Sequence, residues 1–159
     1  MRATSFLASV IMTGTVAGLG LGASREQIRE ALGDQCLADQ RKKSLRLDYG
    51  ILEFNLFAGR CETIAVQVHR LANGIEGLIP PVLSAYFQGI SRGISFGALR
   101  DEIEKDGTCL LEELQGQPGY RCYRVVKSHV NLYVVDEAAP EGDPFAPGDL
   151  WSIMISGRG

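Results

Sequence analysis

The sequence predicts an α+β fold made of two tandem units of about 75 residues, 1–75 and 76–159, packed as one saddle-like domain. Three observations predict it: an internal repeat, a helix-forming start to each half, and runs of alternating apolar and polar residues after each start. In each unit we expect two helices joined by a loop and packed on one face of a three- or four-stranded antiparallel sheet.

The internal repeat is carried by two glycine-rich segments, 14–28 and 89–103, which align at a constant offset of 75 residues. Six of the fifteen aligned positions are identical, and three of these are glycines. A repeat at fixed spacing indicates duplicated structural units, so both halves should fold on one plan. Each unit alone is small for a stable core, and the two should therefore share a core or a continuous sheet.

The first helix expected in each unit comes at 6–13 and 81–88. A basic start followed by an apolar run also fits a secretory signal over 1–23, which would make the protein secreted. The copy at 81–88 is internal and cannot be a cleaved leader, so a structural helix and a cytoplasmic location are favoured. The run is too short for a membrane span, which needs about 20 apolar residues.

The second helix of the first unit should begin after Ser24 and end near Gly33. Ser24 and Gln27 have the spacing of a capping box, in which each side chain bonds the other residue's backbone N–H. Leu99 stands at the place of Ser24 in the second unit. We therefore expect the second copy of this helix to be less well capped.

Six strands are expected where apolar and polar residues alternate, at 44–49, 50–56, 62–70, 120–126, 129–136 and 150–156. Such alternation is typical of an antiparallel sheet with one buried face and one face in water. The inward positions include Leu52, Phe54, Val66, Val130, Leu132 and Ile153. Trp151 shares the spacing of Ile153, which slightly favours a place in the core.

The charge and the cysteines exclude several classes of site. The net charge of −3 argues against a nucleic-acid binder, which normally carries a basic stripe. The four cysteines form no C-x-x-C motif and have no histidine nearby in sequence, so we expect no metal site. Cys36 could reach Cys61 and Cys109 could reach Cys122, but in a reducing compartment all four should be free.

No motif in the sequence predicts a cofactor or a catalytic residue. Gly18–Ala23 matches the dinucleotide pattern G-x-G-x-x-A, but a helical segment precedes it where that fingerprint needs a strand. There is no Gly-x-Ser-x-Gly elbow and no Ser/His/Asp or Cys/His pattern. The chain is therefore expected to be non-enzymatic. The alternative is a small enzyme that uses His69 or His129 as a general base.

Two short motifs, one in each unit, resemble the β-lactamase-inhibitory protein family. Gly22-Ala-Ser-Arg25 leads to Gly33-Asp-Gln-Cys36, and Gly97-Ala-Leu-Arg100 leads to Gly107-Thr-Cys109. Units of that family open with a Gly-Met-Thr-Arg type of turn and reach a Gly-x-x-Cys ending. The small outer-membrane assembly lipoproteins of the SmpA/OmlA type share the opening turn. The resemblance implies a protein that binds another protein through the open face of its sheet and through hairpin loops that plug a cleft of the target.

The function expected from this resemblance is an inhibitor or immunity protein that neutralises a partner enzyme or toxin; a cell-envelope assembly module is a further alternative. Tyr, Met and Arg are enriched in interface cores, and several stand on the face that should be wet. The partner-binding residues expected there are Asp48, Glu53, Asn55, Gln67, His69, Arg121, Tyr123, His129, Asn131, Tyr133 and Met154.

A hairpin loop at 137–147 should add to this surface. It replaces the short turn at 58–60 of the first unit, it is acidic, and it contains three prolines and one apolar residue, Phe145. Prolines lower the entropy lost when a loop is ordered on binding. We therefore expect Phe145 to contact the partner.

Overall fold

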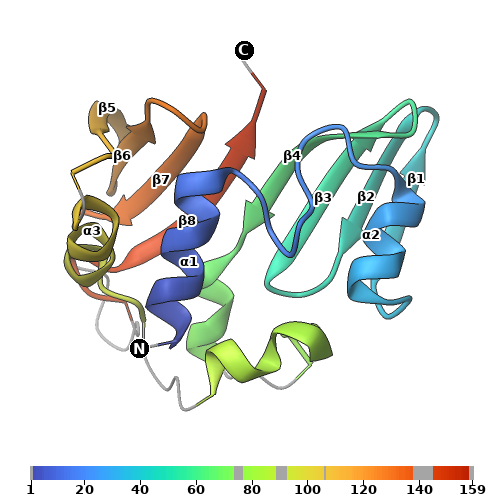
Figure 1. The fold of residues 1–159 in the computed structure, drawn as a ribbon, viewed down its shortest axis with the longest axis horizontal. Coiled ribbons are helices and arrows are strands. Elements are labelled where there is room, and N and C mark those ends of the chain that lie inside the picture. The colour runs from blue at the N-terminus through green and yellow to red at the C-terminus, as the bar shows by residue number, and fades with distance from the viewer. Residues whose placement is uncertain (1, 74–76, 89–92, 106, 138–144, 158–159) are drawn as a thin grey trace.

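The computed structural model describes residues 2–73, 77–88, 93–105, 107–137 and 145–157. Within these residues the chain forms an α+β fold with one eight-stranded antiparallel sheet (Figure 1). The predicted fold class is confirmed at this level, whereas the arrangement of two tandem units as a saddle stays a prediction.

The described helices are α1 (Arg2–Thr13), α2 (Arg25–Leu32) and α3 (Phe96–Glu104), with the 3-10 helices η1 (Val68–Asn73) and η2 (Pro81–Phe87). The strands are β1 (Leu37–Arg41), β2 (Ser44–Asp48), β3 (Leu52–Phe57), β4 (Arg60–Val66), β5 (Leu111–Gln117), β6 (Tyr120–Val125), β7 (Val130–Val135) and β8 (Leu150–Ser156).

The sheet is ordered β1-β2-β3-β4-β8-β7-β6-β5, so both halves of the chain contribute to it. Strands β1 to β4 form a meander from one edge, and β5 to β8 form another from the opposite edge. The two meanders meet where β4 pairs with β8, from Thr63 opposite Ser156 to Val66 opposite Ile153. The sheet is therefore continuous across the middle of the molecule.

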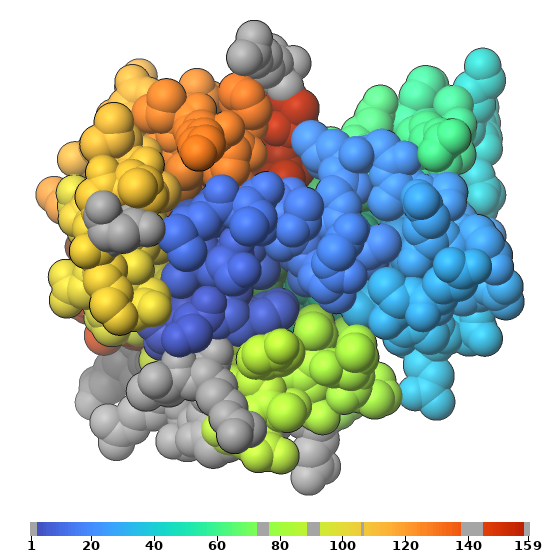
Figure 2. All heavy atoms as spheres, viewed as in Figure 1, coloured from blue at the N-terminus to red at the C-terminus, as the bar shows by residue number. Residues whose placement is uncertain are grey.

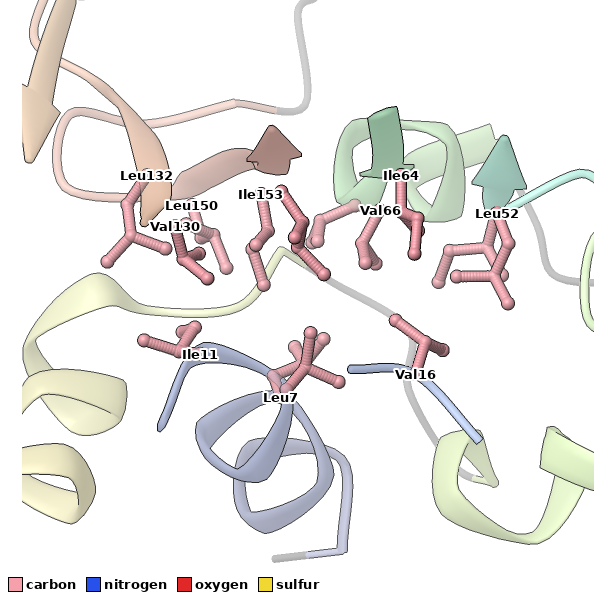
Figure 3. Packing of buried hydrophobic residues seen from close by; sticks show 14 of the residues in the cluster. Leu7, Ile11, Val16, Leu52, Ile64, Val66, Val130, Leu132, Leu150 and Ile153 are labelled. Atoms are coloured by element: carbon pink, nitrogen blue, oxygen red, sulfur yellow. The ribbon is translucent and has the colours of Figure 1, made fainter. Parts of the chain in front are cut away.

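The described helices cover one face of the sheet, and the hydrophobic core lies between the two layers (Figures 1 and 3). Figure 2 shows α1 at the centre of this face, between α2 and α3. In Figure 3, Leu7 and Ile11 of α1 point toward the sheet. The predicted inward positions are confirmed, because all of them are buried: Leu52, Phe54, Val66, Val130, Leu132 and Ile153.

The segment that resembles a signal is the structural helix α1. Its residues Ala3, Leu7, Ala8, Val10 and Ile11 are buried in the core. At the matching place in the second half, 81–88, the structure has the 3-10 helix η2 rather than an α-helix. None of the described helices has the length and apolar character needed to cross a membrane.

The start of α3 differs from the prediction. The helix begins one turn earlier than the repeat suggests, and Ser95 is its N-cap, with its hydroxyl accepting a hydrogen bond from the Ala98 N–H at 3.4 Å. Leu99 is instead buried inside the helix. The capping box of Ser24 and Gln27 in α2 is confirmed. The expectation that α3 is less well capped is confirmed too, because Ser95 accepts a single long hydrogen bond and no reciprocal one is made, although the capping residue is Ser95 rather than the residue at the place of Leu99.

Neither of the two candidate pairs, Cys36 with Cys61 and Cys109 with Cys122, forms a disulfide. Cys61, Cys109 and Cys122 are buried, while Cys36 is half-buried and packs against the core.

Candidate protein-binding face

The open face of the sheet is the surface opposite the helix layer. Its composition follows from the cross-strand pairs, since residues directly opposite each other in an antiparallel ladder point to the same side. One row of pairs crosses all eight strands: Leu37, Asp48, Glu53, Ala65, Met154, Asn131, Arg124 and Glu112. No described helix covers this side (Figure 1), so the row is a cross-section of the open face.

Six of the predicted partner-binding residues lie on the open face: Asp48, Glu53, Asn55, Asn131, Tyr133 and Met154. All six are half-buried, as expected for side chains in the middle of an uncovered sheet. Gln67 and His69 border the same face. Gln67 follows β4 and donates from Nε2 to Glu53 Oε2 at 3.4 Å, and His69 lies in η1 rather than on the predicted strand.

The prediction that Tyr123 and Arg121 lie on the open face is wrong. Tyr123 pairs with Leu132, so it points to the helix side, where it is buried and stacks on Phe96 with ring centroids 4.6 Å apart. Arg121 pairs with Val134 and points to the same side, where it reaches Asp136 at 3.2 Å. In 120–125 the even positions and the odd positions each contain one tyrosine and one arginine. The alternation therefore did not show which of the two sets is buried.

The prediction for His129 as a strand residue is also wrong. This residue ends the turn between β6 and β7 and has a positive φ of 56°. Its neighbour Ser128 donates a hydrogen bond to the Ile11 carbonyl at 2.6 Å, which ties this turn to the end of α1. His129 is therefore exposed on a turn, away from the rows of side chains on the open face.

One half of the open face holds an ionic cluster formed by Arg46, Asp48, Glu53 and Arg70. Arg46 Nε lies 2.5 Å from Glu53 Oε1, and its Nη2 lies 3.2 Å from Asp48 Oδ2. Arg70 completes the ring with distances of 3.1 Å to Asp48 and 3.3 Å to Glu53. The two arginines balance the two carboxylates, so the cluster adds no net charge to the face.

This cluster is largely withdrawn from water on its acidic side. The Asp48 and Glu53 side chains are only 14% and 12% exposed, against 43% for Arg46. The hydrogen bond from Arg46 is the main cause that lowers the pKa of Glu53 below its usual value, against an opposing effect of burial. Arg70 also donates to the Gly50 carbonyl at 2.7 Å, so the cluster fixes η1 to the turn between β2 and β3.

The other half of the face carries an aromatic cluster formed by His69, Tyr120, Phe145 and Trp151. Trp151 is its centre. The His69 ring stacks on it at 4.3 Å with an interplanar angle of 5°, and the Tyr120 and Phe145 rings lie 5.2 Å and 4.8 Å away. Such offset and tilted arrangements are favourable for aromatic rings. The cluster thus joins η1, β6, β8 and the described end of the acidic loop.

The placement of Trp151 follows from a β-bulge. Tyr133 pairs with Ser152, but Val134 pairs with Leu150, so Trp151 is the extra residue of β8. Leu150 takes the core position that regular alternation would give to Trp151, and it is 1% exposed. Trp151 is half-buried instead, and the core role suggested by its spacing is wrong.

His69 is held in one orientation by its neighbours. Its Nδ1 lies 3.3 Å from the Trp151 carbonyl oxygen, which can only accept a hydrogen bond. The neutral ring therefore carries its proton on Nδ1 and leaves Nε2 as an acceptor. Burial is the main cause that lowers the pKa of His69, and nearby Arg70 lowers it further. The ring is therefore mostly neutral at pH 7.

The described surface offers little that suits catalysis or metal binding. Among the described residues, no group of three or more His, Cys, Asp and Glu side chains could hold a metal ion. The described open grooves have volumes of about 190, 420 and 570 Å³, and neither histidine lines any of these three. Compared with known protein families, with curated proteins and with solved structures, the chain shows no match.

Sequence reasoning missed the residues that organise the site. Arg46 and Arg70 have no sequence signal, because they approach Asp48 and Glu53 only through strand pairing and the turn into η1. Tyr120 was not among the predicted partner-binding residues, although it lies in the predicted strand at 120–126. A signal did exist for Trp151, since tryptophan is enriched among the residues that dominate binding energy at interfaces.

Proposed function

We propose that this chain is a non-enzymatic protein-binding module and that its partner binds the open face of the sheet. The observation that carries the proposal is the aromatic cluster around Trp151 on the face left uncovered by the described helices. Tryptophan, tyrosine and methionine are enriched in interface cores, and truncating such anchors commonly costs binding 2 kcal/mol or more.

The surroundings of the aromatic cluster support a preformed surface. Tyr133 and Met154 lie beside it on β7 and β8, and both are half-buried. The ionic cluster stiffens the other half of the face, because Arg70 ties η1 to β2 and β3. A rigid surface loses less entropy when a partner binds, which favours affinity.

The enzyme alternative has weaker support. A general base needs a partner that orients it and a cavity that holds the substrate. His69 instead bonds a backbone carbonyl and stacks on Trp151, and Arg70 is the charged group that affects it. His129 is exposed on a turn. Neither histidine lines any of the three grooves described above, and a broad face of half-buried side chains fits binding better.

The strand order supports a tandem origin for the fold. Strands β1–β4 run inward from one edge and β5–β8 run inward from the other, so each half supplies four consecutive strands. Each set follows a helix with a serine N-cap, Ser24 for α2 and Ser95 for α3. We infer that the two halves are related units arranged in a saddle, as in the family that the sequence resembles. Within this proposal, the module acts as an inhibitor or immunity protein that neutralises an enzyme or toxin. Two unformed candidate disulfides are what a reducing compartment would give.

A comparative pull-down tests the proposal. Wild-type protein and the double variant Tyr133→Ala/Met154→Ala are used as baits in lysate of the native host, and captured proteins are identified by mass spectrometry. A control bait, Val82→Ala/Leu21→Ala, removes exposed apolar side chains outside the sheet. We expect one partner that wild type and control capture and the open-face variant loses. Equal capture by all three baits would place the binding surface elsewhere.

The acidic loop gives a second test of the same surface. Residues 138–144 lie outside the described residues, but Phe145 contacts Trp151 at the edge of the open face. Replacing 140–147 by a short glycine-containing turn should abolish partner binding while the melting temperature changes by only a few degrees, since loop closure entropy depends weakly on length. Unchanged binding would mean that the sheet face alone carries recognition.

A further inference from the structure

The two edges of the sheet are protected to different degrees. Edge strand β5 has two consecutive glutamates, Glu112 and Glu113, and its pairing with β6 is interrupted by a register shift. Charged side chains and bulges are the usual devices that keep an edge from pairing with another chain. Edge strand β1 also carries two charged side chains, Asp39 and Arg41, but they are of opposite sign, and the strand pairs with β2 over five residues without a shift. Every residue of β1 is exposed, and no bulge interrupts it.

The exposed edge of β1 begins at an apolar groove. Leu37, the first residue of β1, is 77% exposed, which is unusual for a leucine on a strand. A groove of about 570 Å³ opens beside it. Cys36, Leu37, Tyr49 and Leu78 give it apolar walls, and the paired Asp48 and Arg70 of the ionic cluster line its other side. A side chain that continues past the end of an added strand could therefore be buried there.

The other end of β1 is strongly basic. Arg41-Lys42-Lys43 is the only run of three consecutive basic residues in the sequence, and all three are exposed. The Arg41 side chain is 84% exposed, and its ion-pair partner Asp39 is 53% exposed, so this pair contributes little. A strand added along β1 would meet positive charge at one end and an apolar groove at the other.

We propose that β1 binds an extended acidic segment of a partner protein by strand addition, with an apolar side chain of that segment in the groove beside Leu37. The sheet is antiparallel throughout, and antiparallel pairing is slightly the more stable. An antiparallel strand opposite β1 starts at Arg41 and ends at Leu37. The segment therefore carries Asp or Glu first and Leu, Ile or Phe about four or five residues later.

This site is separate from the aromatic cluster of the open face. A failure of strand addition at β1 would therefore not refute the proposed function, and a failure of the proposed function would not refute strand addition. Backbone hydrogen bonds along β1 supply affinity, while the basic turn and the groove supply direction and specificity.

The experiment starts with a phage-displayed library of random linear dodecapeptides, selected on immobilised wild-type protein. The most enriched peptide is synthesised with a fluorophore and titrated by fluorescence anisotropy. We expect enriched sequences with the acidic-then-apolar order. Methylating alternate backbone nitrogens of the peptide should weaken binding at least tenfold, because strand addition needs the peptide N–H groups.

Matched protein variants locate the site. Lys42→Glu/Lys43→Glu should raise the dissociation constant at least about fivefold, and Leu37→Ala should also weaken binding. The control Lys105→Glu/Lys127→Glu changes the net charge equally at exposed positions outside β1, and it should bind within about twofold of wild type. Tyr133→Ala should bind as wild type does, which separates this site from the aromatic half of the open face.

Four outcomes would overturn the proposal. The first is no enrichment over an unrelated immobilised protein. The second is equal binding by the two charge-reversal variants, and the third is equal binding of the methylated peptide. The fourth is concentration-dependent self-association of the protein alone, measured by sedimentation, that Lys42→Glu/Lys43→Glu removes; it would assign the edge to a second copy of this chain. Circular dichroism melts of each variant verify that the fold is intact.

Discussion

Replacing Gly50 by alanine should destabilise the protein far more than the same change at Gly59. Both glycines have a positive φ, +91° and +83°, which alanine adopts only with strain. They differ in their surroundings. A Cβ on Gly50 would lie 2.4 Å from the Leu78 carbonyl oxygen and 2.6 Å from its Cα, whereas a Cβ on Gly59 would meet no heavy atom within 4 Å.

The magnitude follows from these two contributions. The positive φ costs alanine about 1 kcal/mol at either site. At Gly50 the clash is with backbone that cannot rotate away, and overpacking of this kind costs about 1–3 kcal/mol more. The Leu78 carbonyl also accepts the Ile51 N–H at 2.7 Å, so its displacement weakens that bond. We expect a loss of about 2–4 kcal/mol for Gly50→Ala and about 1 kcal/mol for Gly59→Ala.

Thermal and urea unfolding followed by circular dichroism measure both variants. For a chain of this length about 1 kcal/mol lowers the melting temperature by about 2–4 °C. Gly59→Ala should therefore melt about 2–4 °C below wild type and Gly50→Ala roughly 4–16 °C below. If the two variants melt within 2 °C of each other, the close approach of Gly50 to the segment at Leu78 is not a feature of the molecule in solution.

Three further predictions concern titratable groups. Trp151 is the only tryptophan and stacks on His69, so its fluorescence should report the protonation of that ring. The midpoint should lie below pH 6.5, because burial lowers the pKa of His69, and His69→Gln should remove the transition. Burial raises the pKa of Cys61 to about 11, so iodoacetamide at pH 8 should alkylate it only after unfolding, whereas half-buried Cys36 should react in the native state. The pKa of Glu53 is lowered in the folded state, so its ionised form stabilises the fold above the unfolded pKa of about 4.5, and this stability is lost as the pH falls. The urea midpoint of Glu53→Gln should therefore depend less on pH between 5 and 3 than that of wild type.

The sequence predicted the strands that have one buried face and missed those at the edges. Leu52, Phe54 and Val66 alternate with polar residues because β3 and β4 have the core on one side. Leu37–Arg41 and Leu111–Gln117 carry little apolar alternation, since an edge strand packs against little of the core. Each edge strand is therefore recognised only by its pairing with a neighbour.

The candidate site was less predictable than the fold, because its key positions depend on local irregularities. The bulge in β8 moves Trp151 out of the core pattern that Ile153 continues. Strand β4 ends at Val66, and His69 lies in the 3-10 helix η1 that follows it. The apolar spacing of the strand nevertheless continues through Val68, so the pattern predicted a longer strand. Hydrophobic alternation contains no information on where a strand gains a residue or stops.

The central position of β8 has a consequence for biosynthesis. This strand follows every other described strand in sequence, yet it fills the gap between β4 and β7. While a ribosome is still making the chain, both neighbours are bare edges that can pair with other nascent chains. In a chain truncated before Leu150, the edges of β4 and β7 stay unpaired. The pairing of β8, rather than the formation of either four-strand meander, is thus the step that closes the two inner edges of the sheet.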